Sequence, residues 1–222
     1  MRGGIRALGS GHATQVREGL GVVVRHPVLR AFAGCLATSN LTSSAFFALY
    51  ILFGTRELGL TAAALGLVYG LGASGALVGA VLAPWAAARL GIGRAVLVGA
   101  WMGSLEVVPV VVATPRTAVP LLVASSLLGN CGWVLYNVNA TSVRQAVTPL
   151  ALQGRVHATM HFLMSGMLPL GALAGGALGE GLGLRATITL AAGGSVLASL
   201  WVWYSPVRAM VRVPEAAGEA GP

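Results

Sequence analysis

Residues 125–163 read SSLLGNCGWVLYNVNATSVRQAVTPLALQGRVHATMHFL, an apolar run that carries three asparagines and is interrupted at Thr148 and Pro149 before a second apolar run begins. On a helix with about 100° per residue, six polar or amphipathic side chains of the first run fall within roughly 80° of one another. They are Ser126, Asn130, Trp133, Asn137, Thr141 and Arg144. The stretch therefore predicts two membrane helices joined by a short turn, the first with a polar stripe that must face protein or water.

This polar stripe has two interpretations. The amides can hydrogen-bond to neighbouring helices and hold a helix bundle together, as polar side chains in membrane helices often do. Alternatively they line a path for a solute, because polar residues at membrane depth are costly unless they have a function. The sequence leaves both open.

The composition of the whole chain places it in a lipid bilayer. Its 222 residues are 56% hydrophobic and only 9% charged, with a mean hydropathy of +0.81, which is too apolar for a soluble domain of this size. The net charge of +8 comes from arginines that are scattered between apolar runs, so we expect no nucleic-acid partner. The cysteines Cys35 and Cys131 lie inside apolar runs and are expected to be buried.

Six apolar segments are long enough to cross about 30 Å of hydrocarbon as helices. We expect an all-α integral membrane protein with spans near residues 28–53, 61–83, 95–113, 119–142, 156–178 and 186–204. Residues 28–204 then form one six-helix domain. Residues 1–27 precede it, with a short interfacial helix at 15–24, and residues 205–222 follow it as a tail without fixed structure.

The distribution of arginine predicts the orientation. Of the fourteen arginines, eleven fall on the side that holds both termini and the turns at 84–94 and 144–155, whereas only Arg56, Arg116 and Arg185 fall on the other side. Positively charged loops resist translocation across the membrane. We therefore expect a multi-pass protein of the plasma (cell inner) membrane with both termini in the cytoplasm.

Glycines recur in the second and fifth segments at spacings that allow close helix packing. The glycines of the two segments are Gly66, Gly70, Gly72, Gly75 and Gly79, and Gly166, Gly171, Gly175 and Gly179. These segments are the second of the first three spans and the second of the last three. The pattern indicates a 3+3 internal repeat, a feature of secondary transporters, although packing alone explains any single glycine.

The sequence contains no pattern typical of an enzyme. It has no aspartate, and its glutamates are not paired as general acid and base. His157 and His161 have the spacing of half a metal site, but no acidic or thiol partner is nearby in the sequence, so no metal is expected. The glycine-rich runs lack the Lys-Ser/Thr ending of a phosphate loop, and we expect no bound cofactor beyond a coupling proton.

Glu106 is the one acidic residue placed well inside a span, in the segment SLEVVPVVV. A carboxylate at that depth is costly unless it is protonated, paired or hydrated, and such a residue is a candidate for proton coupling. Two simpler alternatives are a protonated side chain with one interhelical hydrogen bond and a side chain close enough to the interface to stay hydrated. Pro109, three residues later, is expected to kink this helix.

Several segments together resemble the C-terminal half of a major facilitator superfamily transporter, in particular the branch of enterobactin-type siderophore exporters and macrolide-type efflux proteins. The resemblance extends from about residue 15 to 208. It is carried by REGLGVVVRHPVLRAF (17–32), RELGLTAAALGLVYGLGASGALVGAVLAP (56–84), RLGIGRA (89–95), YNVNATSVRQAVTP (136–149), GRVHATMHFL (154–163) and LPLGALAGGALGEGLGLRAT (168–187).

The resemblance implies a twelve-span fold in two six-helix halves, of which this chain supplies spans seven to twelve. The first and fourth spans of each half line the central cavity in that family. The resemblance therefore places polar and aromatic residues of the first span across from the stripe of the fourth. The candidates for the substrate path are Asn40, Ser44 and Phe47 in the first span and Asn130, Trp133 and Asn137 in the fourth. A cavity of amides, hydroxyls and aromatic rings with little fixed charge suits a bulky amphiphilic solute.

The turn after the second span is similar to the family's loop between spans eight and nine. It keeps Arg89, Gly91, Gly93 and Arg94, which become candidates for a gating loop, but it lacks the aspartate that normally pairs with those arginines. A gating latch at this loop would therefore need an acidic partner from elsewhere.

The resemblance implies proton-coupled efflux of a drug-like or siderophore-like molecule by antiport and alternating access. The expected partners are the lipid bilayer, the solute and a second six-helix half. That half is either upstream in the same polypeptide, on another chain, or a second copy. The competing hypothesis is a truncated or non-transporting membrane protein that acts as a structural or assembly partner.

Overall fold

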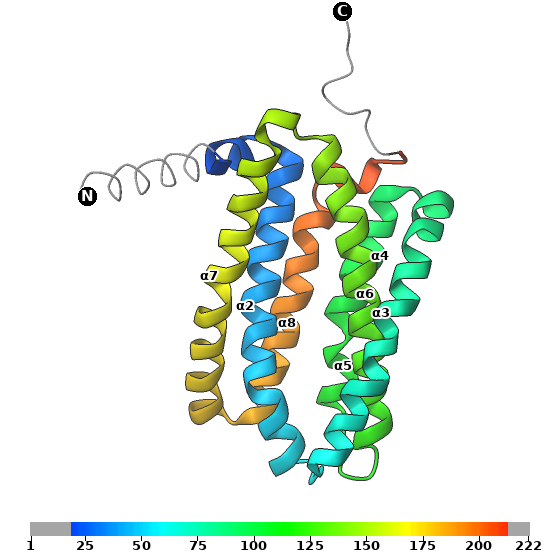
Figure 1. Cartoon of the computed structure of the whole chain (residues 1–222). Coiled ribbons are helices and arrows are strands. Elements are labelled where there is room, and N and C mark those ends of the chain that lie inside the picture. The colour runs from blue at the N-terminus through cyan, green and yellow to red at the C-terminus, as the bar shows by residue number, and fades with distance from the viewer. Residues whose placement is uncertain (1–18, 213–222) are drawn as a thin grey trace, which may run out of the picture.

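A computed structural model describes residues 19–212, and in this part of the chain all regular structure is helical (Figure 1). The long helices are α2 (Pro27–Arg56), α3 (Ala62–Leu90), α4 (Ile92–Leu105), α6 (Ala118–Ala146), α7 (Leu150–Leu182) and α8 (Leu184–Trp203). A short helix α5 (Val107–Val111) continues α4, and a 3₁₀ helix η1 (Pro206–Ala209) follows α8. With α4 and α5 as one span, six helical segments are long and apolar enough to cross a membrane. The chain is a multi-pass membrane protein.

The spans run alternately up and down, so the turns gather at two ends of the bundle (Figure 1). The start of α2, the α3–α4 and α6–α7 turns and η1 lie at one end, which we call the basic end. Its arginines include Arg89, Arg94, Arg155, Arg208 and Arg212. The opposite end holds the other three turns, with Arg56, Arg116 and Arg185.

The pattern of helix packing has an internal symmetry. Helix α2 packs against α7 and α8, α6 packs against α3 and α4, and α4 packs against α8. Exchanging α2, α3 and α4 with α6, α7 and α8 converts the α2 pairs into the α6 pairs and leaves the α4–α8 pair unchanged. This is the arrangement expected of a 3+3 repeat.

Glycines permit the closest approaches in both halves of the repeat. A Cβ added to Gly75 of α3 would lie 2.9 Å from the Cα of Leu127 in α6, and one added to Gly175 of α7 would lie 2.7 Å from the Cα of Ala45 in α2. Such backbone contact is possible only without a side chain. Three of the predicted packing glycines have nothing within 4 Å of that position, so the expectation was wrong for Gly66, Gly70 and Gly166.

The helices are longer, and the turns shorter, than the apolar segments predicted. Helix α3 continues through Pro84 to Leu90, so the expected turn at 84–94 is reduced to Gly91, whose φ of +85° ends the helix. The turn expected at 144–155 is likewise reduced to residues 147–149. Apolarity marks the stretch that crosses the hydrocarbon, whereas a helix can extend past it into the polar interface.

The C-terminal segment is folded as far as residue 212, contrary to the expected unstructured tail. The amides of Ile92 and Gly93 donate to the carbonyls of Val211 and Met210, at 3.3 and 2.9 Å, and Val207 is fully buried. Residues 213–222 lie outside the described part. Of the interfacial helix expected at 15–24, only residues 19–24 are described, and these are helical.

Candidate functional site

A cavity of about 460 Å³ lies midway along the bundle, between two hydrophobic clusters. The cluster toward the basic end includes Phe32, Val96 and Val143, and the cluster toward the opposite end includes Phe53, Leu122 and Ile188. The cavity is lined mainly by α2, α4, α6 and α8. Its wall comprises Cys35, Leu36, Ser39, Asn40, Ser43, Ser44, Phe47, Gly99, Ala100, Gly103, Ser104, Glu106, Gly129, Asn130, Trp133, Tyr136, Leu168, Ser195 and Ser199.

Small residues create this space. Glycine, alanine and serine make up more than half of the lining, whereas the two clusters are filled by valine, leucine and aromatic side chains. Large apolar side chains fill the interior of a packed bundle and leave few voids. Small residues on facing helices do not fill it, so an internal volume remains. The wall therefore carries polar groups beside apolar ones, at a depth where lipid-facing surfaces are apolar.

Two amides of the predicted substrate path lie on the cavity wall. Asn40 in α2 donates to the carbonyl of Leu36 at 2.7 Å, and Asn130 in α6 donates to the carbonyl of Ser126 at 2.8 Å. These bonds within one helix leave the amide oxygens of Asn40 and Asn130 without a donor among residues 19–212. Each amide can thus accept a hydrogen bond from a solute.

The other two asparagines of α6 are placed differently. Asn139 is only 3% exposed and donates to the carbonyls of Leu135 at 2.9 Å and Ala83 at 3.4 Å, so it connects α6 to α3. Asn137 is half-buried and is not part of the cavity wall. Of the three asparagines of α6, Asn130 in the polar stripe therefore lies at the cavity, whereas Asn139, outside the stripe, contributes to helix packing.

The aromatic and hydroxyl candidates also reach the cavity. Phe47 and Trp133 line it and are 51% and 49% exposed, so each presents a large apolar ring surface there. The hydroxyl of Ser44 donates to the carbonyl of Leu168 at 2.6 Å and so links α2 to α7. All the candidates for the substrate path except Asn137 therefore share one wall.

Glu106 contributes the only carboxylate of the cavity wall, and no lysine or arginine lines it. Its side chain packs directly against Gly129 of α6, where a Cβ would overlap the carboxylate oxygen Oε2. Within residues 19–212, the carboxylate has no ion pair and no hydrogen bond. One of the three roles considered for Glu106 was a protonated side chain with an interhelical hydrogen bond. No residue within 19–212 forms such a bond with its carboxylate.

Glu106 also marks a break between α4 and α5 within the third span. Pro109 cannot donate to the carbonyl of Leu105, and its ring crowds that carbonyl, so a regular helix is interrupted there. The hydroxyl of Ser125 in α6 donates to the backbone carbonyl of Glu106 at 2.6 Å, which ties the break to the neighbouring helix. The span is thus interrupted close to where a kink was expected from Pro109, and Glu106 at the interruption lines the cavity.

The gating-loop candidates lie far from this cavity, at the basic end. Gly91 and Gly93 allow the C-terminal segment to pack on the α3–α4 turn, because a Cβ on Gly93 would collide with the carbonyl of Val207. Arg89 and Arg94 flank this turn and are exposed. Among residues 19–212, neither arginine has an ion pair.

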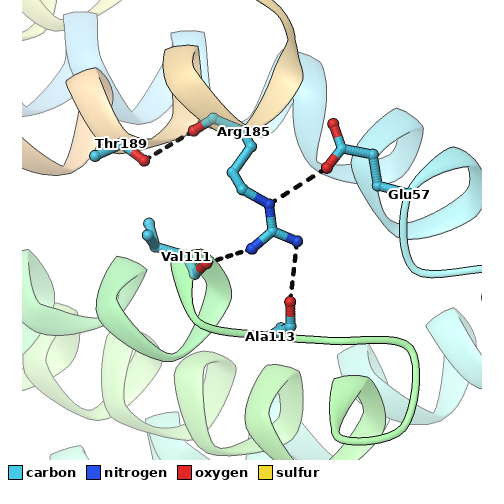
Figure 2. Close-up of polar contacts among 5 residues, drawn as sticks. All are labelled: Glu57, Val111, Ala113, Arg185 and Thr189. Carbon is cyan, nitrogen blue, oxygen red and sulfur yellow. Dashed lines mark hydrogen bonds and ion pairs between the residues drawn. The ribbon is translucent and has the colours of Figure 1, made fainter.

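A cluster around Arg185 at the opposite end was not singled out by the sequence (Figure 2). Its Nε lies 3.4 Å from Oε2 of Glu57, and its two terminal nitrogens donate to the carbonyls of Val111 at 2.6 Å and Ala113 at 3.0 Å. Its guanidinium also lies 5.1 Å from the ring centre of Phe53. The arginine joins the ends of α2, α5 and α8. The sequence signal is weak, because it consists only of an arginine and a glutamate near two separate turns at the end with few charges.

Comparison with known protein families places this geometry in context. Residues 5–169 match the family described as MFS/sugar transport protein, which covers more than half of the chain. No curated protein sequence matches the chain. The match does not distinguish the enterobactin and macrolide branch within the superfamily. Together with six apolar spans, the paired helix packing and a polar cavity at mid-depth, this match shows that the chain belongs to the major facilitator superfamily of membrane transporters.

Proposed function

We propose that the chain is one half of a proton-coupled exporter for a bulky amphiphilic molecule, with the 460 Å³ cavity as part of the solute site. One observation carries the proposal. The cavity wall combines two amides with free oxygens, the exposed rings of Phe47 and Trp133 and a single carboxylate; within residues 19–212 that carboxylate has no ion pair. Few positions in a membrane bundle tolerate such a set without a ligand or water to satisfy it.

Glu106 is the group that would exchange the proton. A charged carboxylate in a bilayer is costly unless it is paired or hydrated. Because the described residues offer Glu106 no cation, closing the cavity around it favours the protonated form, and opening the cavity to water permits release. Solute and proton then bind to the same cavity at different times, as antiport by alternating access requires.

The class of solute follows from the wall. Cavities of roughly 300–1,000 Å³ hold drug-sized ligands. Phe47 and Trp133 offer apolar contact, Asn40 and Asn130 offer hydrogen bonds, and the near absence of charge suits a molecule with both properties. An exporter of this kind places the basic end in the cytoplasm of the plasma membrane and encloses the solute with a second six-helix half.

A sugar or glycoside is the second candidate for the solute. The family description names sugar transport, and amides beside aromatic rings are also suitable for binding sugar hydroxyls and ring faces. The two candidates differ in what they require of the wall. A sugar depends mainly on the amides, whereas an amphiphile depends mainly on Phe47 and Trp133.

Extrusion measured in cells that carry the gene at its own locus tests the proposal. Cells with the wild-type gene, a deletion, Asn130→Ala or Trp133→Ala are loaded with a fluorescent cationic amphiphile or a radiolabelled disaccharide. Ser142→Ala is the matched control, because this half-buried serine of α6 donates only to a carbonyl of its own helix. Immunoblots of membrane fractions verify equal insertion.

We expect deletion and Trp133→Ala to slow amphiphile efflux at least tenfold, with Ser142→Ala equal to wild type. Asn130→Ala should have the smaller effect on the amphiphile. Loss of disaccharide movement with Asn130→Ala, and unchanged amphiphile efflux, would support the sugar instead. If deletion changes the movement of neither probe, the proposal fails for these solutes, and the competing hypothesis of a non-transporting assembly partner is favoured.

A further inference from the structure

A second cavity, of about 670 Å³, opens at the basic end, where the C-terminal segment crosses the α3–α4 turn. Four arginines line it, two from the turn and two from the segment after α8. They are Arg89, Arg94, Arg208 and Arg212. The proposed transport uses the mid-bundle cavity, and nothing in that proposal requires the two tail arginines.

The fold brings these arginines together. Backbone hydrogen bonds from Ile92 and Gly93 to Val211 and Met210 hold the tail on the turn, and the buried Val207 anchors it to the bundle. Gly93 lacks the Cβ that would collide with the carbonyl of Val207. The pairing of arginines more than a hundred residues apart in sequence thus depends on a defined packing contact.

The charge of this cluster is uncompensated in the described part of the chain. Within residues 19–212 none of the four arginines has an ion pair or a hydrogen bond to another residue. The described acids are elsewhere: Glu57 pairs with Arg185 at the opposite end, Glu106 lines the other cavity, and Glu180 lies near the opposite end of α7. Four positive charges therefore face one cavity without a counter-charge from residues 19–212.

We propose that this cavity binds a phosphate group, supplied by the headgroup of an anionic phospholipid. Arginine forms paired hydrogen bonds with phosphate oxygens, and basic pockets at the ends of membrane helices bind anionic headgroups. The lipid source is favoured because the same cavity is lined by Leu90 and Val211, which are 40% and 73% exposed and can contact acyl chains. A soluble phosphate has no use for these apolar side chains.

Binding to the purified full chain in phosphatidylcholine nanodiscs tests the site without any transport, so its failure leaves the proposed function untouched. Short-chain phosphatidylglycerol, short-chain phosphatidylcholine and inorganic phosphate are titrated separately, and bound molecules are counted by native mass spectrometry. The variants are Arg89→Gln with Arg94→Gln, and Arg208→Gln with Arg212→Gln. The matched control is Arg56→Gln with Arg116→Gln, two arginines at the opposite end.

We expect phosphatidylglycerol to bind more tightly than phosphatidylcholine, and either pair of substitutions at the cavity to weaken it by about 25-fold, since each arginine near an anionic headgroup contributes about fivefold. The control pair should bind as wild type. Gly93→Val keeps all four arginines but displaces the tail, and should weaken binding as well. Circular dichroism checks that each variant remains helical.

Equal binding of phosphatidylglycerol and phosphatidylcholine would overturn the proposal. So would an equal loss in the control pair, or wild-type affinity in both pairs of substitutions at the cavity. Binding of inorganic phosphate with the same dependence on arginine would support the phosphate site and assign it to a soluble phosphate instead of a lipid.

Discussion

The contact between α3 and α6 makes a quantitative prediction for one glycine. Gly75 faces α6, where an added Cβ would contact the carbonyl oxygen of Leu127 and lie 2.9 Å from its Cα and 3.0 Å from its carbonyl carbon. Gly70, in the same helix, has nothing within 4 Å of the same position. Gly75→Ala and Gly70→Ala therefore add the same methyl group to one helix, at a position that contacts α6 and at a position that contacts no other residue within 19–212.

The size of the effect follows from the distances. Ordinary contact at a Cβ begins at 3.4 Å, and the atoms in the way are backbone, so the helices must separate by roughly 0.5 Å or more. Such a gap forfeits about a quarter to a half of the dispersion energy of the atoms involved, and overpacking of this kind costs about 1–3 kcal/mol. Gly70→Ala should instead gain up to about 1 kcal/mol from helix propensity.

The melting temperature of each variant in detergent measures this difference. A thiol-reactive dye suits the purpose, because Cys35 and Cys131 are free and buried and become reactive on unfolding. With about 2–4 °C per kcal/mol for a chain of this size, we expect Gly75→Ala to melt at least about 2 °C below Gly70→Ala. Equal melting temperatures would refute the reasoning that glycine at this position is required for helix contact.

Three further substitutions test other parts of the structure, each by the same melting assay. Arg185→Gln should lower the free energy of unfolding by about 2 kcal/mol, because two charged hydrogen bonds to carbonyls are lost. Glu57→Gln should lower it by less than about 1 kcal/mol, since that ion pair is partly exposed. Equal effects of the two substitutions would contradict this ranking. Ser125→Ala removes the hydroxyl that donates to the carbonyl of Glu106 and should cost about 1 kcal/mol, and no change would indicate that the bond contributes little. Pro109→Ala should raise the melting temperature, because the new amide can donate to the carbonyl that proline leaves free, and a fall would show that the break is favourable in itself.

Much of the fold could be predicted because it depends on length and on one-dimensional patterns. Six apolar segments of bilayer length predict six spans, and the glycines at 75 and 79 and at 171 and 175 predict close packing in equivalent helices. The limits of the helices were predicted less well. Gly91 and residues 147–149 are shorter turns than expected, because polar residues beyond the hydrocarbon can continue a helix.

The candidate site was predictable only in part. A helical projection places Asn130 and Asn137 on one stripe, but it cannot show that Asn130 lines a cavity while Asn137 does not, since that depends on which helices pack on either side. The clusters around Arg185 and around Arg89 and Arg208 were missed for the same reason. Each joins residues distant in sequence, and no spacing within a single helix indicates them.

The role of Glu106 in proton coupling is the central claim, and solute-driven proton movement tests it most directly. Inside-out membrane vesicles, prepared from cells with the gene at its own locus, are acidified by respiration, and a pH-sensitive dye reports proton release when the amphiphile is added. The variant is Glu106→Gln, and the matched control is Glu180→Gln, an exposed glutamate near the end of α7.

The proposed mechanism predicts that wild type and Glu180→Gln release protons on addition of the amphiphile, and that Glu106→Gln releases at least tenfold fewer while it is inserted in equal amount. Proton release by Glu106→Gln at the wild-type rate would contradict it, and Glu106 would then be a structural residue at the helix break.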